Sequence, residues 1–113
     1  MAQALSKGDI KELRDWYGLT QADFARAVGV SERAVIGCEG GDTHPMPVAR
    51  RSLDLLDDLR LRLLKRFGES RAHTWLQAPN RALRGSAPRD VLLVSGPIPV
   101  RDLLVGDDAG TYR

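Results

Sequence analysis

Few side chains in this sequence have the type and spacing that catalysis requires. His44 and His73 lie far apart in the sequence, without the spacing of a zinc-binding helix, and one cysteine, Cys38, cannot complete a set of ligands. The stretch GCEGG, residues 37–41, lacks the lysine and the spacing of a phosphate-binding loop. No serine or cysteine lies in a recognisable nucleophile motif. We therefore expect no enzyme, no metal site and no cofactor, which leaves binding to another macromolecule.

The composition restricts the kind of partner only weakly. The chain has 113 residues with 17 Lys and Arg against 15 Asp and Glu, so any contact with nucleic acid depends on where the basic side chains lie. A hydrophobic content of 42% is typical of a globular protein. No apolar run approaches the roughly 20 residues of a membrane span. The N-terminus lacks the apolar core of a signal peptide, and a lone cysteine fits a reducing compartment, so we expect a cytoplasmic protein without a membrane role.

Apolar residues recur with helical spacing and seldom alternate, which predicts an all-α protein. We expect a first helix over residues 9–17, a second from its N-cap Thr20 to Val28, and a third from its N-cap Ser31 to the glycines at 40 and 41. The prolines in segment 42–47 predict an extended linker, and Pro47 suits the first turn of a long helix that continues to Phe67. The leucines of that helix form a broad apolar stripe at positions 53, 56, 59, 63 and 64.

Shorter helices are expected in the remainder of the chain. Gly68 is a suitable stop for the long helix, and Ser70 is the expected N-cap of a short helix through Leu76. Asn80, after Pro79, can cap the next turn by bonding backbone groups. Two further helices are predicted over residues 88–94 and 100–105, with the sequence SGPIP, residues 95–99, as the break between them.

The turn Gly29-Val30-Ser31 joins two short helices in the manner of a helix-turn-helix motif, because a glycine and a small residue allow a close crossing. The string LTQADFARAVGVSERAVIGCEGG, residues 19–41, has its glycines and apolar residues at the spacing of this motif. It resembles the Cro/CI-type DNA-binding domains, and the resemblance covers about residues 7–56. It implies an operator-DNA partner.

The resemblance also implies which residues contact DNA, although few of them have side chains suited to reading bases. It implies that Gln21 contacts backbone phosphates and that Glu32, Arg33 and Gly37 face base edges. Arg33 can bond to guanine, whereas Glu32 repels phosphate and Gly37 offers no side chain. We therefore expect weak or assisted DNA binding, or a motif kept only for folding and dimerisation. The expected phosphate partners are Lys7, Arg33, Arg50 and Arg51.

A second resemblance begins with the sequence WLQAPNRALRGSAPRDVL, residues 75–92, which combines a tryptophan, prolines and turn-forming residues. Together with the apolar residues at 100, 103 and 104 and the sequence GTY at 110–112, it resembles the C-terminal domain of the Xre/MbcA/ParS family of bacterial antitoxins. Members of that family are encoded beside a RES-domain toxin that consumes NAD, by degrading it or by transferring ADP-ribose. The resemblance implies that this protein binds and silences such a toxin.

The family mechanism gives the C-terminal tail a physical role. The tail ends in small residues that can enter a cleft, where it would exclude NAD by occupying its site, and Tyr112 can anchor it. Asp107 and Asp108 suit an arginine-lined pocket. The alternative is a solvated chain end. The expected toxin contacts are Trp75, Asn80, Arg81, Arg84, Asp107, Asp108, Gly110, Thr111, Tyr112 and Arg113.

Two functions remain open at this stage. The first is an antitoxin whose residues 1–67 form a helix-turn-helix bundle with its long linking helix, and whose residues 68–113 form a small toxin-binding module. This protein would silence a toxin and regulate its own operon, and its long helix favours a homodimer within a hetero-oligomeric complex. The second is a stand-alone helix-turn-helix repressor whose C-terminal half serves only dimerisation or sensing.

Overall fold

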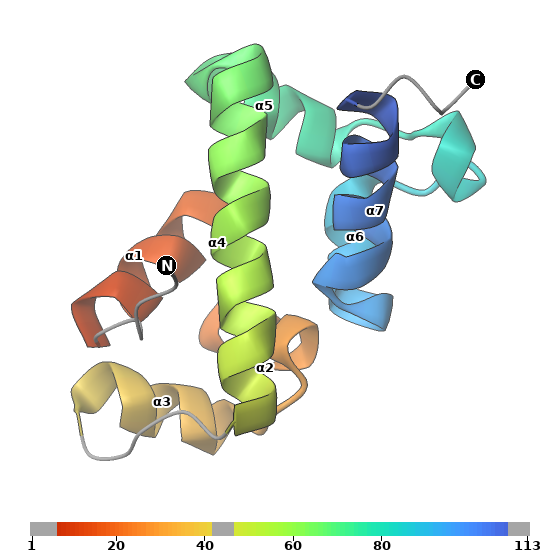
Figure 1. Ribbon diagram of the computed structural model, residues 1–113. Helices are drawn as coiled ribbons and strands as arrows, with labels where there is room; N and C mark the ends of the chain where they lie inside the picture. The colour runs from red at the N-terminus through yellow and green to blue at the C-terminus, as the bar shows by residue number, and fades with distance from the viewer. Residues whose placement is uncertain (1–6, 42–46, 109–113) are drawn as a thin grey trace.

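The computed structural model describes the backbone of residues 7–41 and 47–108, and within these ranges it contains seven α-helices, one short 3-10 helix and no strand (Figure 1). The prediction of an all-α protein is confirmed. The expected linker over 42–46 and the tail over 109–113 lie outside the described residues. The elements are α1 (Lys7–Tyr17), α2 (Gln21–Val28), α3 (Glu32–Gly40), α4 (Pro47–Phe67), α5 (Glu69–Gln77), η1 (Arg81–Leu83), α6 (Pro88–Ser95) and α7 (Pro97–Asp108).

Local signals in the sequence set the ends of α2 and α3. The hydroxyls of Thr20 and Ser31 each accept a hydrogen bond of 3.1 Å from the backbone N–H three residues further on. These bonds satisfy N–H groups that have no partner inside the helix. Gly29 ends α2 with φ of 86°, and Gly41 ends α3 with φ of 81°, conformations that glycine adopts without a steric penalty. The predicted limits of both helices are confirmed.

The long helix α4 runs through the middle of the molecule, with α1 and α3 on one side, α6 and α7 on the other, and α2 behind its lower part (Figure 1). Its predicted apolar stripe is confirmed, because Leu53, Leu56, Leu59 and Leu63 are all buried. The hydroxyl of Tyr17 in α1 donates a 2.5 Å hydrogen bond to the carbonyl of Leu56. None of the described helices combines the length and the apolar character that a membrane crossing needs.

The described residues on the two sides of Gly68 pack into one core. Helix α6 packs against α2, and α7 packs against α4. Phe24 from α2, Leu56 from α4, and Leu92 and Leu104 from α6 and α7 are members of a single buried cluster. The second half of the molecule is therefore fixed to the helix-turn-helix half by a shared apolar interior, and not merely by the covalent chain.

Polar contacts reinforce this arrangement at two places. The indole Nε1 of Trp16 in α1 donates to Oε1 of Glu69 in α5 at 3.1 Å, and its ring lies 4.6 Å from that of His73. His73 thus packs against an aromatic ring. Between α7 and the middle of α4, Nε of Arg101 donates to Oδ2 of Asp58 at 2.8 Å.

Two single glycines form the connections between consecutive helices in the second half. Gly68 joins α4 to α5 with φ of 81° and ψ of 174°, and Gly96 joins α6 to α7 with φ of 81° and ψ of −172°. This region of backbone space is essentially restricted to glycine. Each glycine N–H donates to the carbonyl four residues earlier, to Leu64 and Leu92 respectively. One residue therefore ends one helix and starts the next at both positions.

These junctions correct two expectations from the sequence. Ser70 is not the N-cap of α5, because Gly68 occupies that position without a side-chain cap bond. The last helix begins at Pro97, not at Val100, so the break SGPIP shrinks to one residue. Pro97 and Pro99 both fall in the first helical turn, where a missing N–H removes no intrahelical hydrogen bond.

Candidate functional site

A part-buried ion pair fixes α3 relative to α1 and α2. Nε and Nη2 of Arg14 donate to the two carboxylate oxygens of Glu39 at 2.7 and 3.1 Å, and Nη1 donates to the carbonyl of Leu19 at 3.0 Å. The side chains of Arg14 and Glu39 are only 14% and 8% exposed. Gln21 Nε2 donates to Glu39 Oε1 at 3.1 Å. Three helices therefore meet at one carboxylate, which sets the orientation of the third helix.

The charge of this cluster is stabilised by its hydrogen bonds. Burial alone would raise the pKa of Glu39, but the hydrogen bonds from Arg14 and Gln21 outweigh burial and leave that pKa below its ordinary value. The hydrogen bond to Glu39 in turn raises the pKa of Arg14. Sequence reasoning missed Arg14. The phosphate contact of Gln21 stays a prediction, and its amide already serves Glu39.

The outer face of α3 brings together the residues expected to face DNA bases. Glu32 and Arg33 are exposed and Gly37 is partly exposed, whereas Val35 is buried beneath them. Ile36 lies on the same face and is 49% exposed, a position that sequence reasoning did not select. Its spacing of three and four residues from Arg33 and Glu32 is the signal that could have identified it.

Of the other residues expected to contact DNA phosphates, the structure describes the side chains of Arg50 and Arg51 but not that of Lys7. Arg50 and Arg51 are exposed in the first turns of α4, which follows α3 after a short connection. Both side chains are therefore accessible to a ligand at this end of the molecule. The side chain of Lys7 lies outside the described residues. Contact of Arg50 and Arg51 with DNA stays a prediction.

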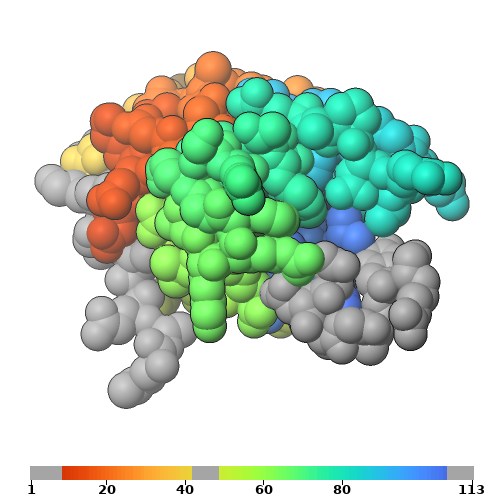
Figure 2. Space-filling model, turned by 90° about the horizontal axis from the view of Figure 1, so that it is seen from above, coloured from red at the N-terminus to blue at the C-terminus, as the bar shows by residue number. Residues whose placement is uncertain are grey.

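Asn80 closes the turn between α5 and α6, as its sequence context predicts. Its Oδ1 accepts from the N–H of Ala82 at 2.9 Å, and its carbonyl accepts from Leu83 and Gly85 at 3.0 and 2.9 Å. Its own N–H donates to the carbonyl of Ser86 at 3.0 Å. These four bonds tie residues 80–86 into a compact turn, which lies at the edge of the molecule away from α1 (Figures 1 and 2).

The turn displays two arginines expected to contact a toxin. Arg81 and Arg84 are both exposed. Arg84 has φ of 58°, and it is the one non-glycine residue with positive φ within the described ranges. A left-handed backbone costs a side-chain-bearing residue roughly 1–2 kcal/mol. Such strain tends to persist at functional positions, so the placement of Arg84 is consistent with a binding role.

Trp75 has a structural role besides the predicted one. Its ring stacks on Phe67 at the end of α4, with centroids 6.1 Å apart and an angle of 26° between the planes. Ala72 and Leu76 of the same helix are buried, whereas Trp75 is half-buried. Part of the indole thus anchors α5 and part stays accessible to a partner.

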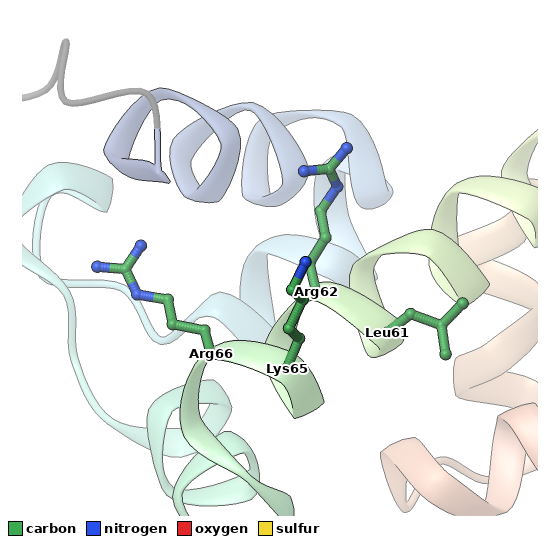
Figure 3. Close-up of a pocket in the computed structure, with 4 residues that line it drawn as sticks. All are labelled: Leu61, Arg62, Lys65 and Arg66. Atoms are coloured by element: carbon green, nitrogen blue, oxygen red, sulfur yellow. The ribbon is translucent and has the colours of Figure 1, made fainter.

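A hollow with basic walls lies on the C-terminal half of α4, and sequence reasoning did not select it. The hollow has a volume of about 590 Å³ and is lined by Leu61, Arg62, Lys65 and Arg66. The three basic side chains extend outward from the helix (Figure 3). Arg62 Nε also donates to Asp58 Oδ2 at 2.8 Å. Burial would raise the pKa of Asp58, but its bonds to Arg62 and Arg101 lower it. Lys65 and Arg66 lie in the last turn of α4, where positive charge interacts favourably with the negative end of the helix dipole.

The expected tail contacts fall mostly beyond the described part of the chain. Asp107 and Asp108 form the last backbone positions of α7, and their side chains lie outside the described residues. Gly110, Thr111, Tyr112 and Arg113 lie outside them entirely. Contacts from these six residues stay predictions.

Two segments of the chain match models of known protein families. Residues 62–110 match the model of the antitoxin Xre/MbcA/ParS C-terminal toxin-binding domain, and residues 10–47 match a helix-turn-helix model. The chain is 37% identical over 90 residues to a "Probable mycobacterial cidal antitoxin" of Mycobacterium tuberculosis, which covers 80% of this chain and 76% of that protein.

The fold is also similar to a solved one. A chain in the crystal structure of the M. tuberculosis MbcT-MbcA toxin-antitoxin complex superposes with a TM-score of 0.62, covering 95% of this chain and 96% of that one at 21% identity. That likeness concerns the fold alone, whereas the identity to the curated antitoxin concerns most of the sequence. This chain belongs to the Xre/MbcA/ParS antitoxin family.

Proposed function

We propose that this antitoxin neutralises a partner toxin through its α5 to α7 half and binds operator DNA through α3. The observation that carries the proposal is the match of residues 62–110 to the toxin-binding domain, together with 37% identity to a curated antitoxin. The helix-turn-helix match over residues 10–47 supports the DNA-binding part.

The turn over residues 80–86 supports a role in toxin recognition. Asn80 holds the turn closed, so Arg81 and Arg84 are presented on a backbone that binding need not order. Guanidinium groups bind carboxylates and phosphates with two parallel hydrogen bonds. We expect these arginines to contact acidic groups on the toxin, with the accessible part of Trp75 alongside them.

The finer proposal concerns the toxin and the way it is blocked. The family resemblance implies a RES-domain toxin that consumes NAD, and we propose that the C-terminal tail occupies its NAD site. Support comes from α7, because buried Val100 and Leu104 and the bond from Arg101 to Asp58 fix the helix from which the tail departs. A firmly held starting point reduces the entropy lost when a tail enters a cleft.

Co-expression tests the antitoxin activity. The neighbouring reading frame should encode a protein that stops growth when expressed alone and is harmless when expressed with this chain. Failure of this chain to restore growth would contradict the proposal. The Arg33→Ala variant serves as a control, since it should restore growth as the unaltered chain does.

Truncation tests the blocking mechanism. Deleting residues 106–113 should let NAD consumption resume while the two proteins still co-purify, because the docking surface on α5 and the 80–86 turn remains. An NAD assay on the purified pair makes the measurement. Retained inhibition by the truncated chain would show that the tail is not the blocking element.

A gel shift tests the DNA-binding part of the proposal. Arg33→Ala should abolish the shift of DNA taken from upstream of the gene, because this exposed guanidinium is the side chain on α3 best suited to guanine. Lys65→Ala is the matched control, since it also removes one exposed positive charge but lies on α4 at the basic hollow (Figure 3). An unchanged shift with Arg33→Ala would mean that Arg33 does not contact the DNA.

A further inference from the structure

Ile36 is an apolar side chain on a helix face that is otherwise charged or bare. It is 49% exposed, although it follows directly after the buried Val35. Successive residues of an α-helix are rotated by about 100°, which places Ile36 between Glu32 and Arg33 on the outer face of α3. The arrangement therefore places a half-exposed isoleucine on the side of α3 that also carries Glu32 and Arg33.

Glycines make this isoleucine more prominent. The other positions on the same face are Gly37 and Gly40, which carry no side chain. Arg33 and Ile36 are consequently the groups that project furthest along the middle of the helix, with Glu32 at its first turn. The bond between Arg14 and Glu39, a residue one turn further along α3 than Ile36, holds the helix in place, so the projecting groups keep a fixed direction.

The chemistry of this face matches the major groove of DNA. Thymine presents a methyl group there, which is the apolar feature among base edges that are otherwise donors and acceptors. An isoleucine beside an arginine can pack against that methyl while the arginine bonds to a neighbouring guanine. We propose that Ile36 contacts a thymine methyl group and selects thymine within one or two base pairs of the base that Arg33 contacts. This inference rests on the proposed DNA binding by α3.

A protein partner fits the same face less well. Protein interfaces form around contiguous apolar or aromatic clusters, whereas Ile36 is a single apolar group between charged residues and glycines. Glycine positions allow the helix backbone to approach the floor of the major groove closely, which brings the neighbouring side chains within reach of the base edges. The observations therefore favour a base edge over a protein surface.

The test uses the full chain and one DNA fragment prepared in two forms. The probe is the duplex immediately upstream of the gene, amplified once with thymine and once with uracil, which lacks the methyl group. Fluorescence anisotropy measures the affinity of the unaltered chain, of Ile36→Ala and of Val94→Ala for both forms. Val94 is 80% exposed on α6, so it controls for the loss of an exposed branched side chain away from α3.

The expected result is a coupling between Ile36 and the methyl groups. The unaltered chain and Val94→Ala should bind uracil DNA about four-fold more weakly for each methyl group contacted. Ile36→Ala should bind thymine DNA more weakly by a similar factor and should no longer distinguish the two forms. Circular dichroism is expected to be unchanged, because alanine is a better helix former than isoleucine.

Three outcomes would overturn the inference. The first is an equal preference for thymine DNA in the unaltered chain and in Ile36→Ala. The second is unchanged DNA affinity of Ile36→Ala with weakened co-purification of the toxin, which would assign Ile36 to a protein contact. The third is no binding of the unaltered chain to either DNA form, which would also remove the DNA-binding part of the proposed function. The co-expression assay scores the toxin-neutralising part separately.

Discussion

The two halves of the molecule use different means to define their helices. In the first half, α2 and α3 begin with a hydroxyl that accepts a backbone hydrogen bond and end with a left-handed glycine. In the second half, α5 and α6 begin without a side-chain cap bond, and α6 is joined to α7 by a single glycine. The limits of α2 and α3 are therefore set by residues next to the helices themselves.

The second half depends instead on what it packs against. Leu92 of α6 and Val100 and Leu104 of α7 are almost completely buried, and these helices lie against α2 and α4. Short helices are marginal in water without such packing. We therefore expect the second half to need the surface of the helix-turn-helix half in order to fold.

The largest expected effect follows from separating the halves. A fragment of residues 68–113 should give the far-ultraviolet circular dichroism of an unfolded chain, because its buried residues lose the faces of α2 and α4 that cover them. A fragment of residues 1–67 should retain more helix per residue, because its caps are internal. A helical, cooperatively melting fragment 68–113 would refute the comparison.

A single core substitution should show that the two halves unfold together. Leu92→Ala removes a side chain with 0% exposure and should lower the free energy of unfolding by about 3 kcal/mol. Urea unfolding should remain one transition, because Leu92 belongs to the core shared by both halves. Val94→Ala, on the same helix, is the control and should change stability by less than about 0.5 kcal/mol. Two separate transitions would show independent halves.

Within the first half, the pair of Arg14 and Glu39 should supply a stability that depends on pH. Glu39→Gln should lower the free energy of unfolding at neutral pH by about 2 kcal/mol, because Arg14 would lose a charged partner while staying largely buried. The pKa of Glu39 in the folded state lies below its ordinary value of 4.5. Its contribution is therefore complete above about pH 4.5 and is lost as the pH falls through the lower folded value.

Unfolding curves at several pH values check this prediction. The stability difference between the unaltered chain and Glu39→Gln should shrink as the pH falls below that range. Asp54→Asn is the control, because Asp54 is an exposed carboxylate on α4, away from Arg14, and its loss should leave stability unchanged within error. A difference that stays constant with pH would mean that the pair does not act through ionised Glu39.

The smallest effect concerns the caps themselves. Ser31→Ala should cost about 1 kcal/mol, because it removes the acceptor for the N–H of Ala34. Ser70→Ala should cost less than about 0.5 kcal/mol, because Gly68 occupies the N-cap of α5 and the side chain of Ser70 has no capping role. Thermal melts of both variants make the measurement. Equal losses would show that both halves rely on local caps.

Sequence reasoning succeeded where the chain carries local signals. Thr20, Ser31, Gly29 and the leucine spacing of the long helix predicted the limits of α2 and α3 and the buried face of α4. Asn80 and its turn were predicted in the same way. The resemblance predicted the family, because its motif residues are dense in both halves.

The features that the sequence did not reveal depend on contacts between distant residues. The bond from Arg14 to Glu39 spans 25 positions, and no local pattern marks an arginine on one helix as the partner of a glutamate on another. Ser70 has the residue type of an N-cap, but packing of α5 against α4 left Gly68 in that place. The length of the break over residues 95–99 was overestimated, because Pro97 and Pro99 both fit within the first turn of α7. Exposure of Ile36 required knowledge of which side of α3 meets the core.

The one-residue junctions at Gly68 and Gly96 leave the chain no slack between α4 and α5 or between α6 and α7. A toxin bound to the second half would consequently lie at a fixed distance and angle from any DNA bound to α3. Antitoxin copies bound side by side on operator DNA would then hold their toxins at regular intervals. With flexible linkers in place of those two glycines, this spacing would depend on the shared apolar core alone.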